Sequence, residues 1–129
     1  MKKIACILVI GLLVGVVGCS TMPAGGAESA GNAERGEALF SQALPPAPAC
    51  SNCHAAAPSM FAIGPTLQGI GGRAGARVAG QTAEAYLRAS ILHPRDHIVA
   101  GFRNIMYAEY ADVLTEQDIR DLIAYLQTL

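Results

Sequence analysis

The sequence is poor in positive charge, and its lysines stand only at the very start. Lys2 and Lys3 are the only lysines among its 129 residues, and charged residues make up 15% of the chain. Beyond residue 18, seven arginines stand against ten acidic residues, so negative charges outnumber positive ones by three. Nucleic-acid-binding domains carry a basic face or stripe. The composition therefore predicts that the chain has no nucleic-acid partner.

A hydrophobic run long enough to span a membrane is also missing. The apolar run at residues 4–18 follows a basic start and has 15 residues. As a helix it would reach about 22 Å, short of a hydrocarbon core of ~30 Å. A short apolar run behind a basic start is typical of a secretory signal peptide. We therefore interpret residues 1–18 as a signal peptide that is removed on export.

The end of this run resembles a bacterial lipobox. Residues 16–18, VVG, precede Cys19, which in a lipobox is acylated and becomes the mature N-terminus. Such acylation anchors a protein to a membrane without a spanning helix. We expect residues 19–31 to form a lipidated N-terminus and a flexible tether rich in glycine and alanine. The alternative is an ordinary cleaved signal, in which Cys19 has no role.

Strand patterns and internal repeats are absent from the rest of the sequence. Residues 33–42 predict a first helix, which the prolines within residues 44–48 end. A second helix is expected from an N-cap at Thr82 to a stop at Pro94. Between them, residues 62–80 are rich in glycine and are expected to form a long loop.

The last helix has the clearest pattern. Thr115 and Asp118 resemble a capping box. Apolar residues then recur on one helical face, at Ile119, Leu122, Ile123 and Leu126. We therefore predict that residues 32–129 form one small all-α domain of three to five short helices with long loops. A domain of this size has a meagre core, so we expect a bound group to fill its middle.

The motif CSNCH at residues 50–54 is open to three interpretations. Structural zinc needs four ligands, but no second cysteine pair follows, and Pro94 breaks the helix that would put His93 and His97 on one face. A thioredoxin-like dithiol follows a buried strand, which the approach ALPPAPA does not predict. In a haem anchor the two thiols add to the vinyl groups and the histidine binds iron. Export and the small core favour the haem interpretation.

A haem of this kind needs a second axial ligand. The candidates are the other methionines and histidines of the exported part, Met22, Met60, Met106, His93 and His97. Met22 lies in the expected tether, and Met60 follows His54 too closely to reach the opposite face of the ring. Met106 comes 52 residues after His54, which is long enough to wrap to that face. Met106 is therefore the preferred ligand beside a haem motif, although by itself it would be interpreted as a core methionine.

Over residues 32–129 the chain resembles a class I, mono-haem cytochrome c. The matching pieces follow one order along the chain: Gly36, Phe40, residues 50–54, Gly64-Pro65, Gly72-Arg73, Met106 and the final LTEQDIRDLIAYLQTL. The resemblance implies a small cytochrome c fold around one covalent haem c. It places the thioethers on Cys50 and Cys53, and it implies that His54 is the proximal ligand and Met106 the distal ligand.

The same resemblance assigns roles to residues around the haem. The carbonyl oxygen of Pro65 is expected to accept a hydrogen bond from His54. Arg73 is expected near the haem propionates, with a solvated surface charge as the alternative. The first and last helices are expected to cross, with Gly36 and Phe40 against Leu122 and Tyr125. One departure is Tyr107, which stands where the family usually has proline, so we expect a looser loop at Met106.

A narrower resemblance lies in residues 90–102, SILHPRDHIVAGF. This run is similar to one in the lipoprotein mono-haem subunit of alternative complex III and in cytochrome c domains fused to haem-copper oxidase subunit II. The resemblance makes His93 and His97 loop residues. It implies a non-enzymatic electron carrier that is anchored by lipid, faces the periplasm or cell exterior, and meets other redox proteins or subunits of a quinol-oxidising complex. The alternatives are a free-standing tethered shuttle, or a peroxidase or gas sensor in which Met106 leaves the iron.

Overall fold

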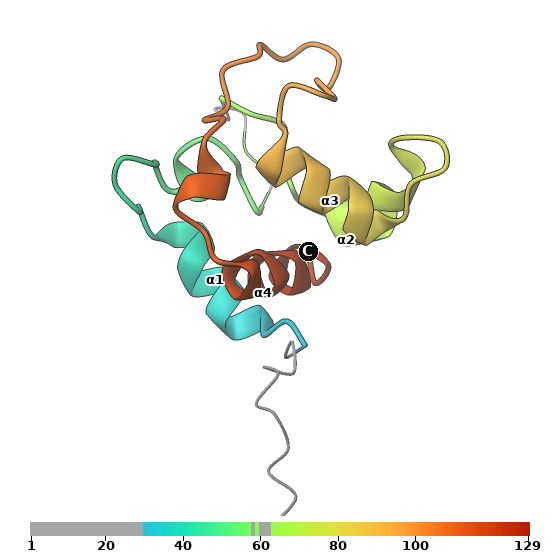
Figure 1. Ribbon diagram of the computed structural model, residues 1–129. Coiled ribbons are helices and arrows are strands. Elements are labelled where there is room, and N and C mark those ends of the chain that lie inside the picture. Colours follow the sequence, from blue (N-terminus) through green and yellow to red (C-terminus); the bar gives the residue numbers. More distant parts are fainter. Residues whose placement is uncertain (1–29, 58, 60–62) are drawn as a thin grey trace, which may run out of the picture.

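The computed structural model describes residues 30–57, 59 and 63–129. Four α-helices occur in these ranges: α1 (Ala33–Ser41), α2 (Ile70–Arg73), α3 (Ala83–Leu92) and α4 (Glu116–Leu126) (Figure 1). Three single 3-10 turns lie between them: η1 (Cys50–Asn52), η2 (Ala74–Ala76) and η3 (Tyr110–Asp112). Within the described part of the chain no strand forms, and only an isolated bridge joins Leu44 and Ala47. The fold is therefore all-α, as the sequence predicted.

Helix α1 begins and ends where its sequence signals stand. The side chain of Asn32 caps its start by accepting a hydrogen bond of 2.9 Å from the backbone N–H of Arg35. The helix ends at Ser41, one residue before the predicted end. The prolines that follow cannot continue a helical hydrogen-bond ladder, which explains the stop.

Helix α4 carries the capping box that its sequence predicted. The hydroxyl of Thr115 accepts from the backbone N–H of Asp118 at 3.2 Å, and the Asp118 carboxylate accepts from the Thr115 N–H at 3.0 Å. Five apolar residues of this helix are buried, namely Ile119, Leu122, Ile123, Tyr125 and Leu126. The helix therefore presents one continuous apolar face to the centre of the domain.

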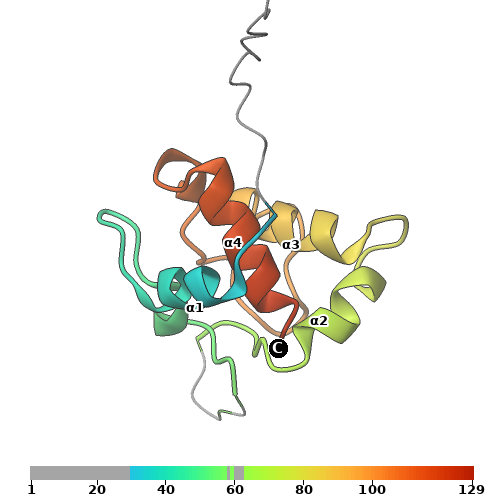
Figure 2. The ribbon, with the colours of Figure 1, turned by 90° about the horizontal axis from the view of Figure 1, so that it is seen from below.

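Helices α1 and α4 cross in close contact, as the family resemblance implied (Figure 2). Gly36 lies directly on the α4 backbone, so that a Cβ at this position would overlap the carbonyl oxygen of Asp121. Beside it, the rings of Phe40 and Tyr125 pack with centroids 5.5 Å apart. The glycine is needed because only a residue without a side chain lets the two backbones approach so closely.

Ion pairs and a hydrogen bond from the N-cap residue of α1 also join α1 and α4 at this crossing. Arg35 of α1 lies 2.8 Å from the Asp118 carboxylate and 3.3 Å from that of Asp121. The Asp121 carboxylate also accepts the backbone N–H of Asn32 at 2.8 Å. Asp121 is fully buried, and Arg35 places a positive charge beside its carboxylate, but Oδ2 of Asp121 has no hydrogen-bond partner among the described residues.

Helix α3 follows the prediction, but residues 62–80 are not wholly a loop. Thr82 caps α3 by accepting from the N–H of Ala85 at 3.1 Å. The prediction for residues 62–80 was wrong in part, because α2 and η2 form there. Gly69 adopts a φ of +67° at the start of α2, and Gly71 lies against the backbone of Gln127 at the end of α4. The turn depends on this tertiary contact, which a glycine-rich sequence does not reveal.

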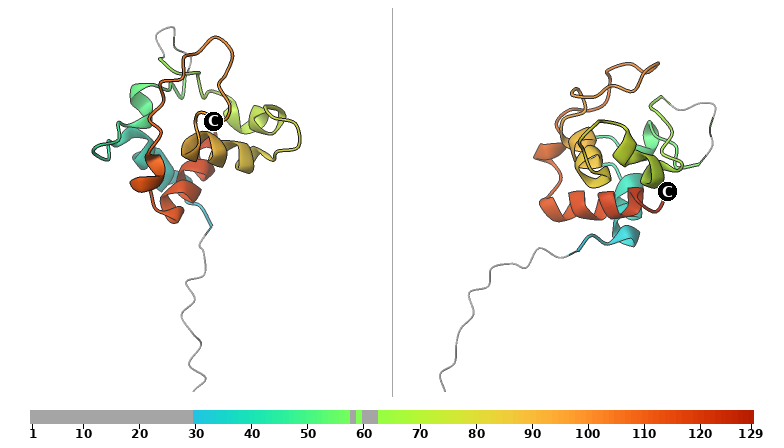
Figure 3. Two further views of the ribbon diagram at one scale, coloured as in Figure 1. Left: turned by 45° about the horizontal axis from the view of Figure 1, so that its top comes forward. Right: turned by 90° about the vertical axis from the view of Figure 1, so that its right-hand side faces the viewer.

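Helices α1 and α4 lie at the end of the domain opposite the loop of residues 93–109 (Figure 1). The start of α1 and helix α4 lie at one end, and the loop of residues 93–109 arches over the other (Figures 1 and 3). Tyr110 begins η3 where this loop returns toward α4. No helix in the described ranges is both long and apolar enough to cross a membrane.

Candidate functional site

A cavity of about 360 Å³ lies between the helices and the long loops. Its walls come from all four α-helices and from the segments between them, namely residues 48–54, residues 63–67, Arg77, the loop of residues 97–107 and Tyr110. Most of its lining is apolar and includes Phe40, Leu67, Ile70, Leu87, Ile91, Val99, Leu122 and Leu126. A cavity of this size and character falls in the range of sites for small molecules and cofactors. The small core predicted from the sequence led us to expect a bound group in the middle of the domain, and this cavity could hold one.

The two cysteines of the motif lie on one wall of this cavity. Both Cys50 and Cys53 are free thiols, and both are half-buried. The turn η1 holds them, because the N–H groups of Cys53 and His54 both donate to the Cys50 carbonyl, at 3.1 and 2.9 Å. Burial raises the pKa of the Cys50 thiol above its usual value. One turn of backbone thus brings two thiols and an imidazole to the same wall.

The ring of His54 is held by the segment that faces it. Its Nδ1 lies 2.9 Å from the carbonyl oxygen of Pro65, so the expected hydrogen bond is present. A carbonyl oxygen only accepts, so Nδ1 must carry the proton. In the neutral ring with this tautomer Nε2 keeps its lone pair, which is the state that a metal-binding histidine requires.

Gly64 makes room for that ring. Its backbone N–H donates to the Cys53 carbonyl at 2.8 Å, which places Gly64 over the imidazole of His54. A Cβ on Gly64 would lie 2.7 Å from Cε1 of His54 and 2.9 Å from Nδ1. The histidine can take this position only because residue 64 has no side chain.

Met106 also lines the cavity, from the loop of residues 97–107. It is half-buried and packs against the hydrophobic core. The structure therefore brings Met106 to the same cavity as the cysteine motif, although the two are far apart in the sequence. His97 lines the cavity as well, and its ring contacts that of Tyr86 with centroids 5.6 Å apart.

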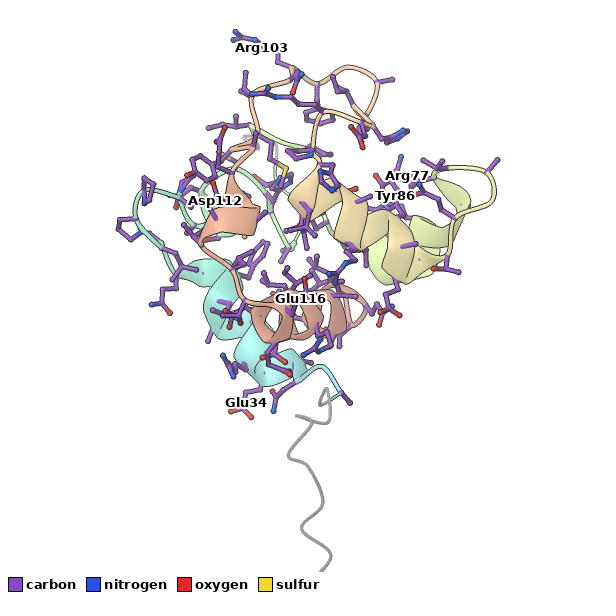
Figure 4. All side chains as sticks on the ribbon, viewed as in Figure 1. Glu34, Arg77, Tyr86, Arg103, Asp112 and Glu116 are labelled. Atoms are coloured by element: carbon purple, nitrogen blue, oxygen red, sulfur yellow. The ribbon has the colours of Figure 1, made fainter. Side chains whose placement is uncertain are left out.

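Two arginines line the cavity, Arg77 and Arg103, and Arg73 is not one of them. Arg73 does not line the cavity, and its guanidinium instead donates to the backbone carbonyls of Thr66 and Gln68. Arg77 does line it, from the end of η2, as does Tyr86 of α3; both residues are labelled in Figure 4. The Nε of Arg77 is buried and has no hydrogen-bond partner among the described residues. The unpredicted turns α2 and η2 separate these two positions, because Arg73 ends α2 and Arg77 follows η2.

Tyr110 is a second residue that the sequence analysis missed. It is buried, lines the cavity and donates a hydrogen bond of 2.9 Å from its hydroxyl to the carbonyl oxygen of Pro48. Burial, with the nearby Cys50 and Cys53 thiols, raises the pKa of the Tyr110 hydroxyl far above its usual value. The only signal in the sequence was an aromatic residue four positions after Met106, which by itself predicts no role.

The alternative sites suggested by the cysteine motif find no support in the described residues. No three His, Cys, Asp or Glu side chains group there as a metal site. The segment before Cys50 is helix α1 and an irregular connection, whereas a thioredoxin-like motif would follow a strand. The residues of the cavity do fit a covalent haem, because it combines two thiols, an imidazole with a free lone pair, a thioether and a largely apolar wall. The predictions for Cys19, Met22 and Met60 lie outside the described residues.

Comparison with known proteins agrees with this arrangement. Among curated proteins, no sequence matches the chain significantly. The family model described as Cytochrome c matches residues 33–129, which is three quarters of the chain. Members of that family bind haem c covalently and transfer single electrons. The match covers every described helix and the whole cavity, and the chain belongs to the cytochrome c family.

Proposed function

We propose that this cytochrome is a lipid-anchored haem subunit of a membrane complex that oxidises quinols, of the alternative complex III type. Electron transfer by a c-type cytochrome follows from the family. The lipid anchor and the membership of a complex go beyond the family. The proposal of an anchor rests on the lipobox-like residues 16–19, and the proposal of a complex rests on the run at residues 90–102.

The residues that line the cavity divide the work of holding the haem. Cys50 and Cys53 would form the thioethers with the haem, His54 would supply a nitrogen ligand to its iron, and Met106 would supply a sulfur ligand. When bound, haem c supplies a one-electron Fe(II)/Fe(III) couple, and His/Met ligation raises its potential. Pro65 fixes the ring and tautomer of His54 through the bond of 2.9 Å. The apolar wall excludes water, which keeps the charge change at iron in a low-dielectric surrounding.

One observation carries this assignment more than any other. The cavity brings the thiols of residues 50–54 and the side chain of Met106 to its wall from opposite ends of the domain sequence. A core methionine would not need a cavity, and a redox dithiol would not need a distant thioether. The shared cavity therefore favours the carrier over the other candidates.

The arrangement of the domain suits a tether at its N-terminal end. Asn32 and the start of α1 lie at the end opposite the loop that carries Met106 (Figure 1). A lipid anchor attached through residues 19–31 would leave that loop facing away from its attachment point. Exposed apolar residues surround the loop and the cavity mouth, namely Ile63, Ile98, Phe102 and Ile105. This face would meet redox partners in the complex.

Ligation by Met106 is tested by carbon monoxide. The reduced wild-type protein, purified with its haem, is expected to show no spectral change on addition of carbon monoxide, because Met106 would occupy the iron position that carbon monoxide needs. M106A is expected to bind it readily, whereas the control M60A is expected to behave as wild type. Rapid binding by the wild-type protein would instead indicate an open iron site of the peroxidase or gas-sensor kind.

The anchor and the complex need separate measurements. The intact mass of the purified protein is expected to show cleavage before Cys19, acyl chains and one covalent haem. C19A is expected to leave the membrane fraction while keeping its haem spectrum. Co-purification of a large multi-haem complex with the wild-type chain would support the subunit role, and its consistent absence would indicate a free-standing tethered shuttle.

A further inference from the structure

The backbone around Met106 is weakly held. Backbone hydrogen bonds to other described residues are absent from Met106, Tyr107 and Ala108, whether as donors or as acceptors. His54 differs in this respect, because its N–H donates to Cys50 and its ring donates to Pro65. The position of Met106 must therefore depend on side-chain packing.

The residues just before Met106 do not provide that packing. Ile105 is 52% exposed and Phe102 is 37% exposed. Side chains with so much surface in solvent have few partners to fix them. The support for Met106 has to come from the residues after it.

Tyr107, the residue directly after Met106, makes a packing contact that the residues before Met106 lack. Its ring meets the ring of Tyr110 edge to face, with centroids 5.1 Å apart and an interplanar angle of 78°. Tyr107 also packs against the hydrophobic core and lines the cavity. An edge-to-face pair of this geometry is among the favourable arrangements of aromatic rings.

Tyr110, the partner of Tyr107, is itself held in place by burial and hydrogen bonds. It is 6% exposed, and its carbonyl accepts from the N–H groups of Val113 and Leu114 just before α4. Its hydroxyl donates to the carbonyl oxygen of Pro48, two residues before Cys50. Tyr110 is thus tied to α4 on one side and to the haem-attachment segment on the other.

We propose that Tyr107 is a positioning residue that holds Met106 at the haem cavity through Tyr110 and Pro48. We call these three residues the tyrosine clamp. The clamp joins the segment that carries the distal ligand directly to the segment that carries the thioethers and His54. The inference rests on the proposed ligation by Met106. In this proposal Tyr107 supplies a packing contact that proline would not supply, so that a side chain holds a segment whose backbone has few hydrogen bonds.

The test compares variants of the purified holoprotein by two readouts. One is the weak charge-transfer band that a thioether bound to ferric haem iron produces, and the other is the affinity of the ferric iron for added imidazole. Y107L removes the ring, and we expect a weaker band and an imidazole affinity about two- to tenfold higher, the range that one aromatic pair supports. Y107F keeps the ring and is expected to match the wild type. Y110F keeps both rings but loses the bond to Pro48, and is expected to shift both readouts in the direction of Y107L.

Y125L provides a matched control for general loss of stability. Tyr125 also makes one aromatic pair, with Phe40, at the crossing of α1 and α4. We expect Y125L to lower the midpoint of unfolding without changing the band or the imidazole affinity. The clamp would be overturned if Y107L had the same band strength and imidazole affinity as the wild type. It would also be overturned if Y107L and Y125L shifted these two readouts equally. A shift in Y107L without one in Y110F would overturn the link through Pro48.

Failure of the proposed ligation gives a different result from failure of the clamp. A wild-type protein without the band, and with a spectrum identical to that of M106A, would overturn ligation by Met106 and the clamp together. If the wild-type protein shows the band, and Y107L and Y110F both show it at the same strength, the clamp alone would be overturned.

Discussion

Gly64 lies against the imidazole ring of His54, so close that a Cβ on Gly64 would stand 2.7 Å from Cε1 of the ring. The next residue, Pro65, accepts the hydrogen bond from Nδ1 of the same ring at 2.9 Å. Two consecutive residues thus set both the plane of the histidine and its tautomer. The site depends on a missing side chain as much as on the side chains present.

We expect G64A to push the His54 ring out of its position. The added methyl would overlap the ring, and overpacking of this kind costs about 1–3 kcal/mol. The hydrogen bond to Pro65 should lengthen, which lowers the basicity of Nε2 and raises the reduction potential of the haem. Spectroelectrochemical titration measures the potential. The control is G75A, where a Cβ would meet its nearest neighbour at an ordinary 3.5 Å, and a G64A potential equal to that of G75A would contradict the prediction.

We expect G36A to destabilise the crossing of α1 and α4. Alanine favours a helix by about 1 kcal/mol over glycine, but its Cβ would overlap the Asp121 carbonyl. Overpacking of this kind costs about 1–3 kcal/mol, so the net loss in the free energy of unfolding should be up to about 2 kcal/mol. Chemical denaturation followed by circular dichroism measures it. G72A is the matched control, since Gly72 is also helical and a Cβ there meets nothing within 4 Å, so it should be neutral or stabilising.

The stability of the domain should fall in acid through Asp118. Burial raises the pKa of this carboxyl, but hydrogen bonds from Thr115 and the charge of Arg35 outweigh it and hold the pKa below its usual value. A group whose pKa is lower in the folded state stabilises the fold above its unfolded pKa of about 3.9. That contribution is lost as the pH falls through the folded pKa.

We expect D118N to remove this part of the acid sensitivity. At neutral pH the variant should lose about 0.5–2 kcal/mol, the range for a lost helix cap. Its curve of stability against pH should then be flatter below pH ~4 than that of the wild type. D112N changes an exposed carboxylate of η3 and is the control. Parallel curves for D118N and wild type would show that Asp118 does not titrate with unfolding.

Arg77 is expected to influence the haem potential more than Arg73. It lines the cavity with an unpartnered Nε, whereas Arg73 is bonded to two backbone carbonyls. Loss of a positive charge at the cavity favours ferric iron, so R77Q should lower the potential. The shift should be on the order of tens of millivolts, since about 59 mV corresponds to a factor of ten for one electron. A larger drop in R73Q than in R77Q would contradict the assignment.

Local patterns predicted the helices and the attachment motif well. The Thr115 and Asp118 capping box, the Thr82 cap and the turn at residues 50–54 each depend on residues within a few positions. The close crossing at Gly36 was also expected, through the family resemblance. Helix α2 was missed, because its glycines disfavour a helix and its stability comes from the contact with Gln127.

The haem site divides along the same line. The CSNCH motif, the distant methionine and the capped last helix could be recognised in the amino-acid sequence, because each can be identified without knowing its neighbours in space. Which arginines line the cavity, and the contact of Tyr107 with Tyr110 beside Pro48, could be learned only from the folded chain. These contacts join residues from different elements, and no local pattern of charge or hydrophobicity records which of several possible neighbours the folded chain brings together.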